Sequence, residues 1–461
     1  MFRTSVKLWS IIISFLSSIT CLAQVPSSLS LSPYASIDRI RLNPALGINS
    51  AYKWDATIIG GHISTASDYT FLRSANLLNI ISRSSDATII DAISEIPETS
   101  DIPVLIFDLD GGRKSFYLSG TIAGPSFSVG LGEDTRLGVF TNARVHASST
   151  MIPENLGIYE LNESYQTNVI NFDEGVASFA SWLEIGAHLS KRIDELSFGV
   201  NLKILRANEG GYINSKETTA YEFIDSVIII NSAPNVEMAL TNSTINANTY
   251  RSTINGSGIG LDIGVAYNTD FLSAGISLND IGVLRYKTNV EIYSREILST
   301  LTDVRTQDYR SFENLRDLLD RFQNFQGISP DNFGVFSVGL PTRLTLYGDY
   351  LYDDKISISG VINQRLPIFA NSLAANNSLV ITPRYETEVW SYYLPITILE
   401  YSSIRIGSAF RIGPLTVGTD HLSSVFLNTD FNGSDLYFNL KIYPFNSSGT
   451  KGGKDVLCPT F

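Results

Sequence analysis

Hydrophobic and polar residues alternate with a period of two over much of this chain, most clearly between residues 258 and 280. This alternation is the pattern of a β-strand, whose successive side chains point to opposite faces. The turn-forming residues 268–270 divide the stretch into two such runs. The pattern therefore predicts a tight antiparallel hairpin.

The two faces of this hairpin differ in a way that favours a membrane barrel. One face is aliphatic with a single aromatic residue, and it consists of Ile259, Leu261, Ile263, Val265, Tyr267, Leu272, Ala274, Ile276 and Leu278. The other face carries Gly, Ser, Asn and Asp262, where a soluble sheet usually carries Lys and Glu. An apolar face suits lipid and a small polar face suits a crowded lumen, so we interpret the hairpin as two strands of a transmembrane barrel. A hairpin of a soluble β-sandwich is the alternative.

The same alternation recurs before and after this hairpin. It is found at 56–65, 126–145, 183–204, 340–351, 355–363, 378–385, 403–411, 413–422 and 434–445. In the last of these strands we expect Tyr437, Tyr443 and Phe445 at the membrane interface. The set predicts an all-β fold, a transmembrane antiparallel β-barrel of about 14 strands with room in its lumen for a plug or a small ligand.

Three long connections separate these strands, at 150–178, 207–257 and 287–339. They are too long for ordinary hairpin turns, so we expect long extracellular loops. Parts of the second connection are β-prone around 221–230. Short helices are predicted at 75–81 and at 312–322, the latter amphipathic.

The N-terminus has the three parts of a secretory signal. Arg3 and Lys7 form its positive region, residues 8–20 are apolar, and Ala23 is the small residue that signal peptidase requires. We therefore expect residues 1–23 to be removed on export to the outer membrane of a gram-negative bacterium.

Both cysteines lie near the ends of the chain. Cys21 raises lipoprotein acylation as an alternative, but Thr20 is unusual directly before such a cysteine. Cleavage after Ala23 leaves only Cys458, so no intramolecular disulfide forms. Cys458 is either an exposed thiol on a flexible tail or a point of attachment.

Composition agrees with a membrane barrel. Only 17% of the 461 residues are charged, and the chain contains 22 Tyr and 24 Phe. Acidic residues outnumber basic ones, 46 against 33, which makes nucleic acid an unexpected partner. After the signal no apolar run reaches the roughly 18 residues of a membrane helix, so closed strands are the way to span the bilayer.

We expect one barrel between two terminal segments. Residues 24–55 form an N-terminal plug or hatch, residues 56–445 the barrel, and residues 446–461 a flexible periplasmic tail. Pro44 forces Asn43 out of helical geometry, which displays a polar side chain on a rigid backbone. The residues assigned to the plug are Arg41, Asn43, Pro44 and Ala45.

Charged residues that alternate out of phase with the lipid face are expected to point into the lumen, since burial beside lipid would be very costly. They are Arg136, Arg144, Glu184, His188, Lys203, Asp262, Arg343, Arg405 and Arg411. Two roles remain open for them: pairing with one another and with the plug, or direct contact with a substrate.

The residues of an enzyme are not recognisable in the sequence. The four histidines, His62, His146, His188 and His421, lie in separate strands without metal-ligand spacing. Residues 108–111 resemble the start of a calcium loop but lack its later ligands. No nucleophile elbow or phosphate-binding loop is present, so we expect no catalysis, no metal and no cofactor.

Several stretches resemble the FadL-type (FadL/TodX-like) family of outer-membrane β-barrels. The triplet at 43–45 is similar to the NPA motif of the family's N-terminal hatch. GIGLDIGVAYNTDFLSAGISLNDIG (258–282), LPTRLTLYGDYLYDDKISISG (340–360), ITPRYETEVWSYYLP (381–395) and RIGPLTVGTDHL (411–422) resemble an uncharacterised branch of it. The resemblance implies 14 strands, a hatch in the lumen, and diffusion of hydrophobic substrates. The polar 207–257 stretch and the cysteine-bearing tail depart from the family's transporters.

Two functional hypotheses follow. The first is a monomeric plugged channel in outer-membrane lipid that binds or passes small hydrophobic molecules. The second is a barrel scaffold that anchors a periplasmic or surface partner, with the C-terminal tail as one contact, as relatives associated with type IX secretion do. An apolar tunnel past Asn43 favours the first hypothesis, and a sealed lumen of paired charges favours the second.

Replacing Arg41 and Asn43 is expected to loosen the plug, because both side chains are assigned to its contacts with the wall. Leakage of small solutes through the reconstituted protein should then rise. Unchanged leakage would count against the assignment.

Overall fold

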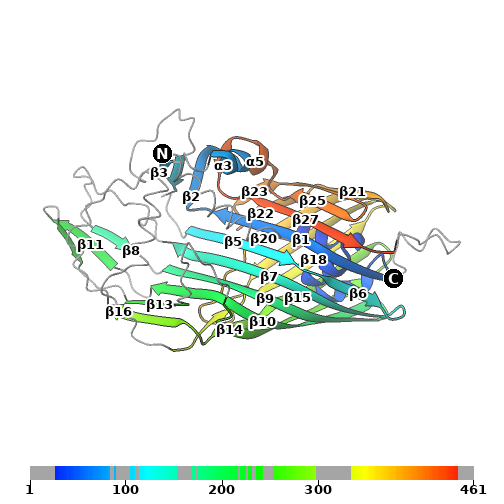
Figure 1. The fold of residues 1–461 in the computed structure, drawn as a ribbon. Coiled ribbons are helices and arrows are strands. Elements are labelled where there is room, and N and C mark those ends of the chain that lie inside the picture. Colours follow the sequence, from blue (N-terminus) through cyan, green and yellow to red (C-terminus); the bar gives the residue numbers. More distant parts are fainter. Residues whose placement is uncertain are drawn as a thin grey trace, which may run out of the picture.

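The computed structural model describes residues 26–83, 88–89, 104–108, 114–152, 169–172, 175–215, 219–224, 227–230, 235–241, 253–296 and 334–444. They form a closed antiparallel β-barrel with the N-terminal residues inside it and small sheets at one end (Figure 1). The predicted signal peptide, the helix predicted at 312–322 and the tail at 446–461 lie outside the described residues.

Fourteen strand positions make up the barrel wall, as the alternation predicts. In order around the wall they are β1 (Trp54–Ser67), β5 (Lys114–Ala123) continued by β6 (Ser126–Gly130), β7 (Thr135–Ile152), β9 (Gly175–Ile193), β10 (Leu196–Ser215), β14 (Gly256–Asn268), β15 (Leu272–Tyr286), β17 (Phe336–Gly339) continued by β18 (Arg343–Leu351), β19 (Ile356–Arg365), β20 (Ser378–Glu386), β21 (Trp390–Tyr393) with β22 (Ile396–Leu399), β23 (Ser403–Ile406) with β24 (Ser408–Ile412), β25 (Leu415–Thr419) and β27 (Asp435–Ile442). β27 pairs with β1 from Ile442 opposite Ala56 to Asp435 opposite Ser64, which closes the sheet.

The remaining elements lie inside the barrel or around one of its ends. They are α2 (Ser27–Ser30) and two 3-10 helices, η1 (Pro33–Arg41) and η2 (Pro44–Asn49), then β2 (Thr70–Ala75), α3 (Leu77–Arg83), β3 (Thr88–Ile89), β4 (Val104–Phe107), β8 (Val169–Phe172), β11 (Thr219–Ile224), β12 (Val227–Ile230), β13 (Asn235–Thr241), β16 (Val290–Glu296), α5 (Leu422–Phe426) and β26 (Thr429–Phe431). β13 and β16 extend the wall beyond the long-loop end, and α3 and α5 lie beside each other near that end (Figure 1). Short turns join the strands at the other end, which is the periplasmic end in outer-membrane barrels.

The wall has an apolar outer face and a polar inner face. In β9 the outward Leu183, Ile185 and Leu189 are exposed, while the intervening Glu184 and His188 are buried. The same alternation holds in β10, where Leu202 and Ile204 are each more than 60% exposed. Side chains of this kind are stable only against an apolar medium, so the outer face is a lipid-contacting band. None of the described helices is long and apolar enough to cross a membrane.

Several predicted boundaries are wrong for physical reasons. The segment predicted as one strand at 403–411 is divided at Gly407, where a Cβ atom would overlap the backbone of Thr419. The strand predicted at 413–422 ends at Thr419, and Leu422 begins a helix. The strand position formed by β21 and β22 was missed because Pro395 interrupts its alternation. Tyr437 and Tyr443 are buried on the inward side of the wall rather than at the interface, because both follow the inward phase of β27, and Phe445 lies outside the described residues.

The described residues of the connection predicted at 207–257 are mostly β-strand. β10 continues to Ser215 without leaving the sheet, and β13 pairs with that extension. β11 and β12 form a hairpin over the β-prone residues near 221–230, as the sequence indicates. The helix predicted at 75–81 is found slightly later, as α3.

Leu202→Arg tests the lipid band, because Phe198 and Ile204 flank it on the same outward face. We expect it to lower the free energy of unfolding in lipid vesicles by about 2–4 kcal/mol. Leu131→Arg is the matched control, since Leu131 is 54% exposed in the turn between β6 and β7. Urea unfolding followed by tryptophan fluorescence measures both, and equal losses would contradict the assignment.

Candidate functional site

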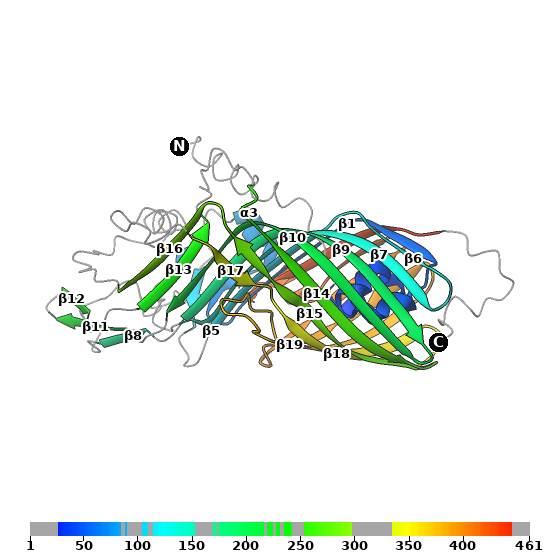
Figure 2. The same ribbon diagram turned by 90° about the horizontal axis from the view of Figure 1, so that it is seen from below.

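Residues 26–50, here called the N-terminal segment, lie inside the barrel in the half nearest the short turns (Figures 1 and 2). The sequence sets its local shape. Pro33 and Pro44 each begin a 3-10 helix, and the side chains of Ser32 and Asn43 accept hydrogen bonds from the first turns. Asn43 has the extended backbone that Pro44 imposes, as expected from the sequence. The segment is therefore compact and almost fully buried.

Asn43 joins the segment to the wall at a point of very close approach. Its Nδ2 donates to the carbonyls of Val265 at 3.1 Å and Ile276 at 3.2 Å, on neighbouring strands β14 and β15. The wall is glycine there, because a Cβ atom at Gly264 would overlap the Asn43 side chain. A Cβ at Gly199 would overlap the backbone of Pro44 and Ala45. These glycines leave room for the segment, which lies directly against the wall at Asn43.

Asp38 joins the segment to β27, the last strand, where the barrel closes against β1. Its carboxylate lies 2.9 Å from Lys441 Nζ and 3.2 Å from Arg41 Nη1, and Asn439 donates to it at 2.6 Å. Burial alone would raise the pKa of Asp38, but Lys441 and Arg41 outweigh burial and hold the pKa below its usual value. The carboxylate is thus charged, and it is neutralised within the lumen.

Further hydrogen bonds connect the segment to strands around the whole wall. They join Ser28 to Asp420, Ser32 to Glu386 and Tyr393, Ile37 to Asp55, Ile40 to Asn201, Arg41 to Asn142 and Arg343, Leu42 to Ser277 and Asn279, and Asn49 to Asn268 and Arg192. Apolar contacts add to them, since Leu42, Ala45 and Leu46 pack with the lumen-facing Tyr347 and Val361.

Four of the nine predicted lumen-facing residues lie in one ion-pair network beside the segment. Arg144 donates two hydrogen bonds to Asp280, at 2.7 and 3.0 Å, and lies 3.4 Å from Glu184. Lys203 bridges Asp262 and Asp280, at 2.7 and 2.8 Å. Arg144 is half-buried and the other members are buried. The three carboxylates outnumber Arg144 and Lys203 by one, and Arg343 acts on Asp280 from farther away. The network therefore resembles a structural contact more than an open binding surface.

Asp280 was missed by the sequence analysis because strict alternation gives it the same phase as the outward Leu278. The pairing of β14 with β15 shifts at Asp262, and Asp280 has a positive φ of 57°. This bulge turns both Asn279 and Asp280 inward. The sequence did contain a signal of this bulge, because an acidic residue occupies a position that the alternation assigns to the apolar outer face.

The other predicted residues are distributed around the lumen. Arg136 pairs with the buried Asp55 at 2.5 Å, and His188 contacts Asn201 at 2.8 Å. Arg411 lies near the short turns, where it donates to Ser391 and its guanidinium covers the ring of Tyr34. Two clusters had not been singled out, the Asp55 pair and the group formed by Arg384 with Asp349 and Glu386.

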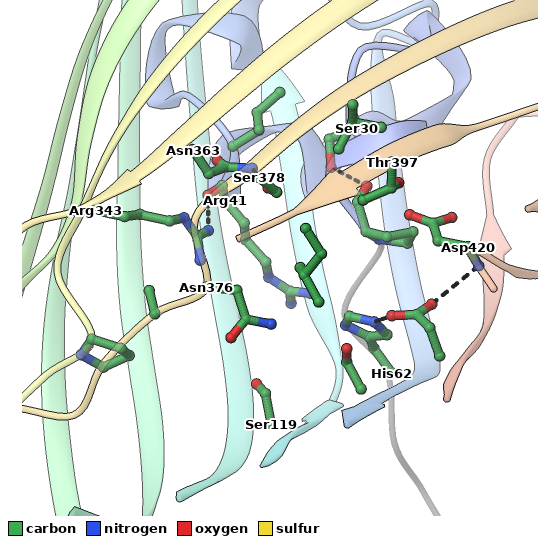
Figure 3. Close-up of a pocket in the computed structure, with 18 of the residues that line it drawn as sticks. Ser30, Arg41, His62, Ser119, Arg343, Asn363, Asn376, Ser378, Thr397 and Asp420 are labelled. Carbon is green, nitrogen blue, oxygen red and sulfur yellow. Dashed lines mark hydrogen bonds and ion pairs between the residues drawn. The ribbon is translucent and has the colours of Figure 1, made fainter. Parts of the chain in front are cut away.

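Arg343 and Arg405 line a different feature, a cavity of about 160 Å³ that we call the chamber. It lies against the N-terminal segment, and Figure 3 shows Arg343 on one side of it and His62 and Asp420 on the other. Its lining is mostly polar and includes Ser64, Ser119, Asn363, Asn376, Ser378 and Thr397. Within the part of the chain that the structure describes, no three His, Cys, Asp or Glu side chains are grouped to hold a metal ion.

One wall of the chamber carries a cluster of acids around His62. Its Nε2 lies 2.7 Å from Asp435, and the backbone N–H of Asp420 donates to the same carboxylate at 3.3 Å. Ser28 and Tyr437 each donate to Asp420 at 2.9 Å. Burial, and then the nearby charge of Asp435, raise the pKa of Asp420 to about 7. This carboxyl is therefore partly protonated at neutral pH.

Comparison with known proteins places the chain in a family by its sequence. Residues 44–420 match the model described as a family of unknown function, DUF5723. The chain belongs to this family. No curated protein matches it.

Solved structures that are similar to this DUF5723 member include a Pseudomonas aeruginosa FadL homologue, with 10% identity, a TM-score of 0.39 and coverage of 90% of this chain and 94% of the other. The Ralstonia pickettii toluene transporter TbuX has 8% identity, a TM-score of 0.32 and coverages of 92% and 96%. The Pseudomonas putida toluene transporter TodX has 8% identity, a TM-score of 0.32 and coverages of 90% and 94%.

Gly199→Ala tests how tightly the segment is held. The added methyl group meets the backbone of Pro44, which cannot move without breaking the contacts of Asn43, so we expect a loss of about 1–3 kcal/mol in unfolding free energy. Gly360→Ala is the matched control, because nothing lies within 4 Å of a Cβ atom there. Urea unfolding in lipid vesicles compares the two variants, and similar losses would argue against close packing at Pro44.

Proposed function

We propose that the protein is an outer-membrane barrel scaffold, closed along its axis by the N-terminal segment. It would act through its surfaces, by holding a periplasmic or extracellular partner. The observation that supports this proposal is the close packing of the N-terminal segment in the lumen, in which Asn43 is fully buried between glycines of the wall and Asp38 is paired with Lys441 of β27. Of the two hypotheses from the sequence, this geometry favours the scaffold.

The free energies of the hydrogen bonds between segment and wall favour a segment that stays in the lumen. Each hydrogen bond between the segment and the wall contributes roughly 0.5–1.5 kcal/mol, so together they amount to on the order of 10–20 kcal/mol. A small ligand with a micromolar Kd supplies about 8 kcal/mol. Binding of such a ligand is therefore insufficient to displace the whole segment, and a passage along the axis would need another source of energy.

The test combines conductance with native purification. In planar bilayers the wild-type protein is expected to be silent, and its reconstitution should not speed the swelling of liposomes in small sugars. Gentle detergent extraction should recover a stoichiometric protein partner that is lost when residues 446–461 are removed. Steady wild-type conductance would overturn the seal, and the absence of any partner in cross-linked native membranes would overturn the scaffold.

Passage of small apolar molecules through the side of the barrel is the second candidate. It is favoured by an apolar groove of about 780 Å³ on the outer face of β7, β9, β10, β14 and β15. Gly260 and Gly282 form part of its floor, and Leu340 lies against them from the inner side. The segment between β19 and β20 touches both spaces, since Phe369 borders the groove and Ala375 borders the chamber.

The same purification separates the two candidates. A stoichiometric apolar ligand, absent from an unrelated barrel extracted alike, would support lateral passage. A protein partner without such a ligand would support the scaffold.

A further inference from the structure

Two arginines that line the chamber, Arg343 and Arg405, form no ion pair with a carboxylate in the described structure, and Asp280 and Asp435 attract them only from a longer distance. Arg343 donates one hydrogen bond, to the carbonyl of Arg41 at 3.3 Å, and Arg405 donates one, to the carbonyl of Thr65 at 3.4 Å. Both bonds are long. The Nε atoms of both arginines are buried without a hydrogen-bond partner among the described residues, and the Arg405 side chain is only 5% exposed.

Four other luminal arginines are satisfied in ways that these two are not, whereas Arg39 also has an unpartnered Nε but donates to the carbonyls of Asn49 and Leu31. Arg136, Arg144 and Arg384 each form an ion pair with a buried carboxylate at 2.5–2.7 Å. Arg411 lacks a carboxylate in the described structure, but its guanidinium donates to Ser391 and to the carbonyls of Thr387 and Glu388. Four arginines line the chamber, and of these Arg343 and Arg405 have one long hydrogen bond each within the described residues.

A buried charge without a partner is expensive, and native proteins rarely keep one without a ligand, ion or ordered water. The acids in the chamber do not supply the partner. Asp435 is already bound to His62 at 2.7 Å, and Asp420 accepts hydrogen bonds from Ser28 and Tyr437. The raised pKa of Asp420 further reduces its negative charge near neutral pH.

The chamber has the size and the secondary donors for a small anion. Its volume of about 160 Å³ is roughly ten times what one water needs by the same measure. Ser119 and Asn376 present a hydroxyl and an amide toward the space (Figure 3). A guanidinium group offers a planar set of N–H donors that matches the oxygens of a carboxylate or a phosphate.

We propose that the chamber is a binding site for a small oxyanion, a carboxylate or phosphate group, held by Arg343 and Arg405. The donors of Ser119 and Asn376 complete its surroundings, and the N-terminal segment forms one boundary of the site. This inference goes beyond the scaffold function, because equilibrium binding in the chamber requires neither a protein partner nor passage through the wall.

Isothermal titration of the purified full-length barrel in detergent tests the site. Sodium phosphate and sodium acetate are titrated separately, with sodium chloride adjusted to keep the ionic strength constant. We expect saturable binding of one anion per barrel for at least one of the two salts, and the preferred salt identifies the oxyanion. Binding of neither salt up to 100 mM, taken as roughly the weakest measurable range, would overturn the proposal.

Three variants locate the binding. Arg343→Gln and Arg405→Gln are each expected to weaken it at least about tenfold, which corresponds to about 1.4 kcal/mol. Arg285→Gln is the matched control, because it removes the same charge from an exposed position on β15, and it should bind like wild type. Equal binding by all three variants would show that the anion binds elsewhere and would overturn the assignment.

Folding is checked in parallel by heat-modifiable migration on gels. If a Gln variant does not fold, Arg405→Lys replaces it, since lysine keeps the charge but loses the planar pair of donors. Weakened binding in this variant supports the site, and unchanged binding contradicts it. Co-purification of a partner is measured independently, so failure of the scaffold proposal and failure of the anion site are distinguishable.

Discussion

The structure depends on one constraint, the need to satisfy every backbone N–H and C=O that lies in hydrocarbon. A sheet in lipid cannot keep free edges, so the first strand must pair with the last. β1 and β27 do so, although more than 370 residues separate Ser64 from Asp435. This pairing creates an enclosed interior, and the interior in turn dictates which side chains are polar. The period-two alternation seen in the sequence is the direct consequence.

Closing the wall creates a second requirement, because fourteen strands enclose more space than their own small side chains fill. The N-terminal segment and the ion pairs around Arg144 and Lys203 fill it. A polar interior whose groups were only partly hydrogen-bonded would be less stable than an apolar one. Here nearly every charged side chain described in the lumen has a partner. The chamber beside Arg343 and Arg405 is the place where that pairing is incomplete, and for that reason we assign a ligand to it.

Much of the architecture could be predicted from the sequence, because successive residues of a barrel strand face lipid and lumen in turn. A few residues are therefore enough to indicate both sides of the wall. Ile185 and Glu184 on β9, for example, each reveal the side of the wall that they face. Pairings at long range were not predictable. Nothing local joins Arg144 to Asp280, and the bulge that turns Asp280 inward appears only when β14 and β15 lie side by side. Likewise, the division of a strand at Gly407 depends on the nearby backbone of Thr419.

Asp38 has a consequence for the order in which the molecule is completed. Its hydrogen-bond partners are Thr57 on the first strand and Asn439 and Lys441 on the last. Before the last strand has joined the first, this carboxylate therefore has only Arg41 and Thr57 beside it and lacks the Lys441 ammonium and the Asn439 amide. Within the barrel, this single buried acid distinguishes a finished molecule from a truncated one, before any partner or ligand has been met.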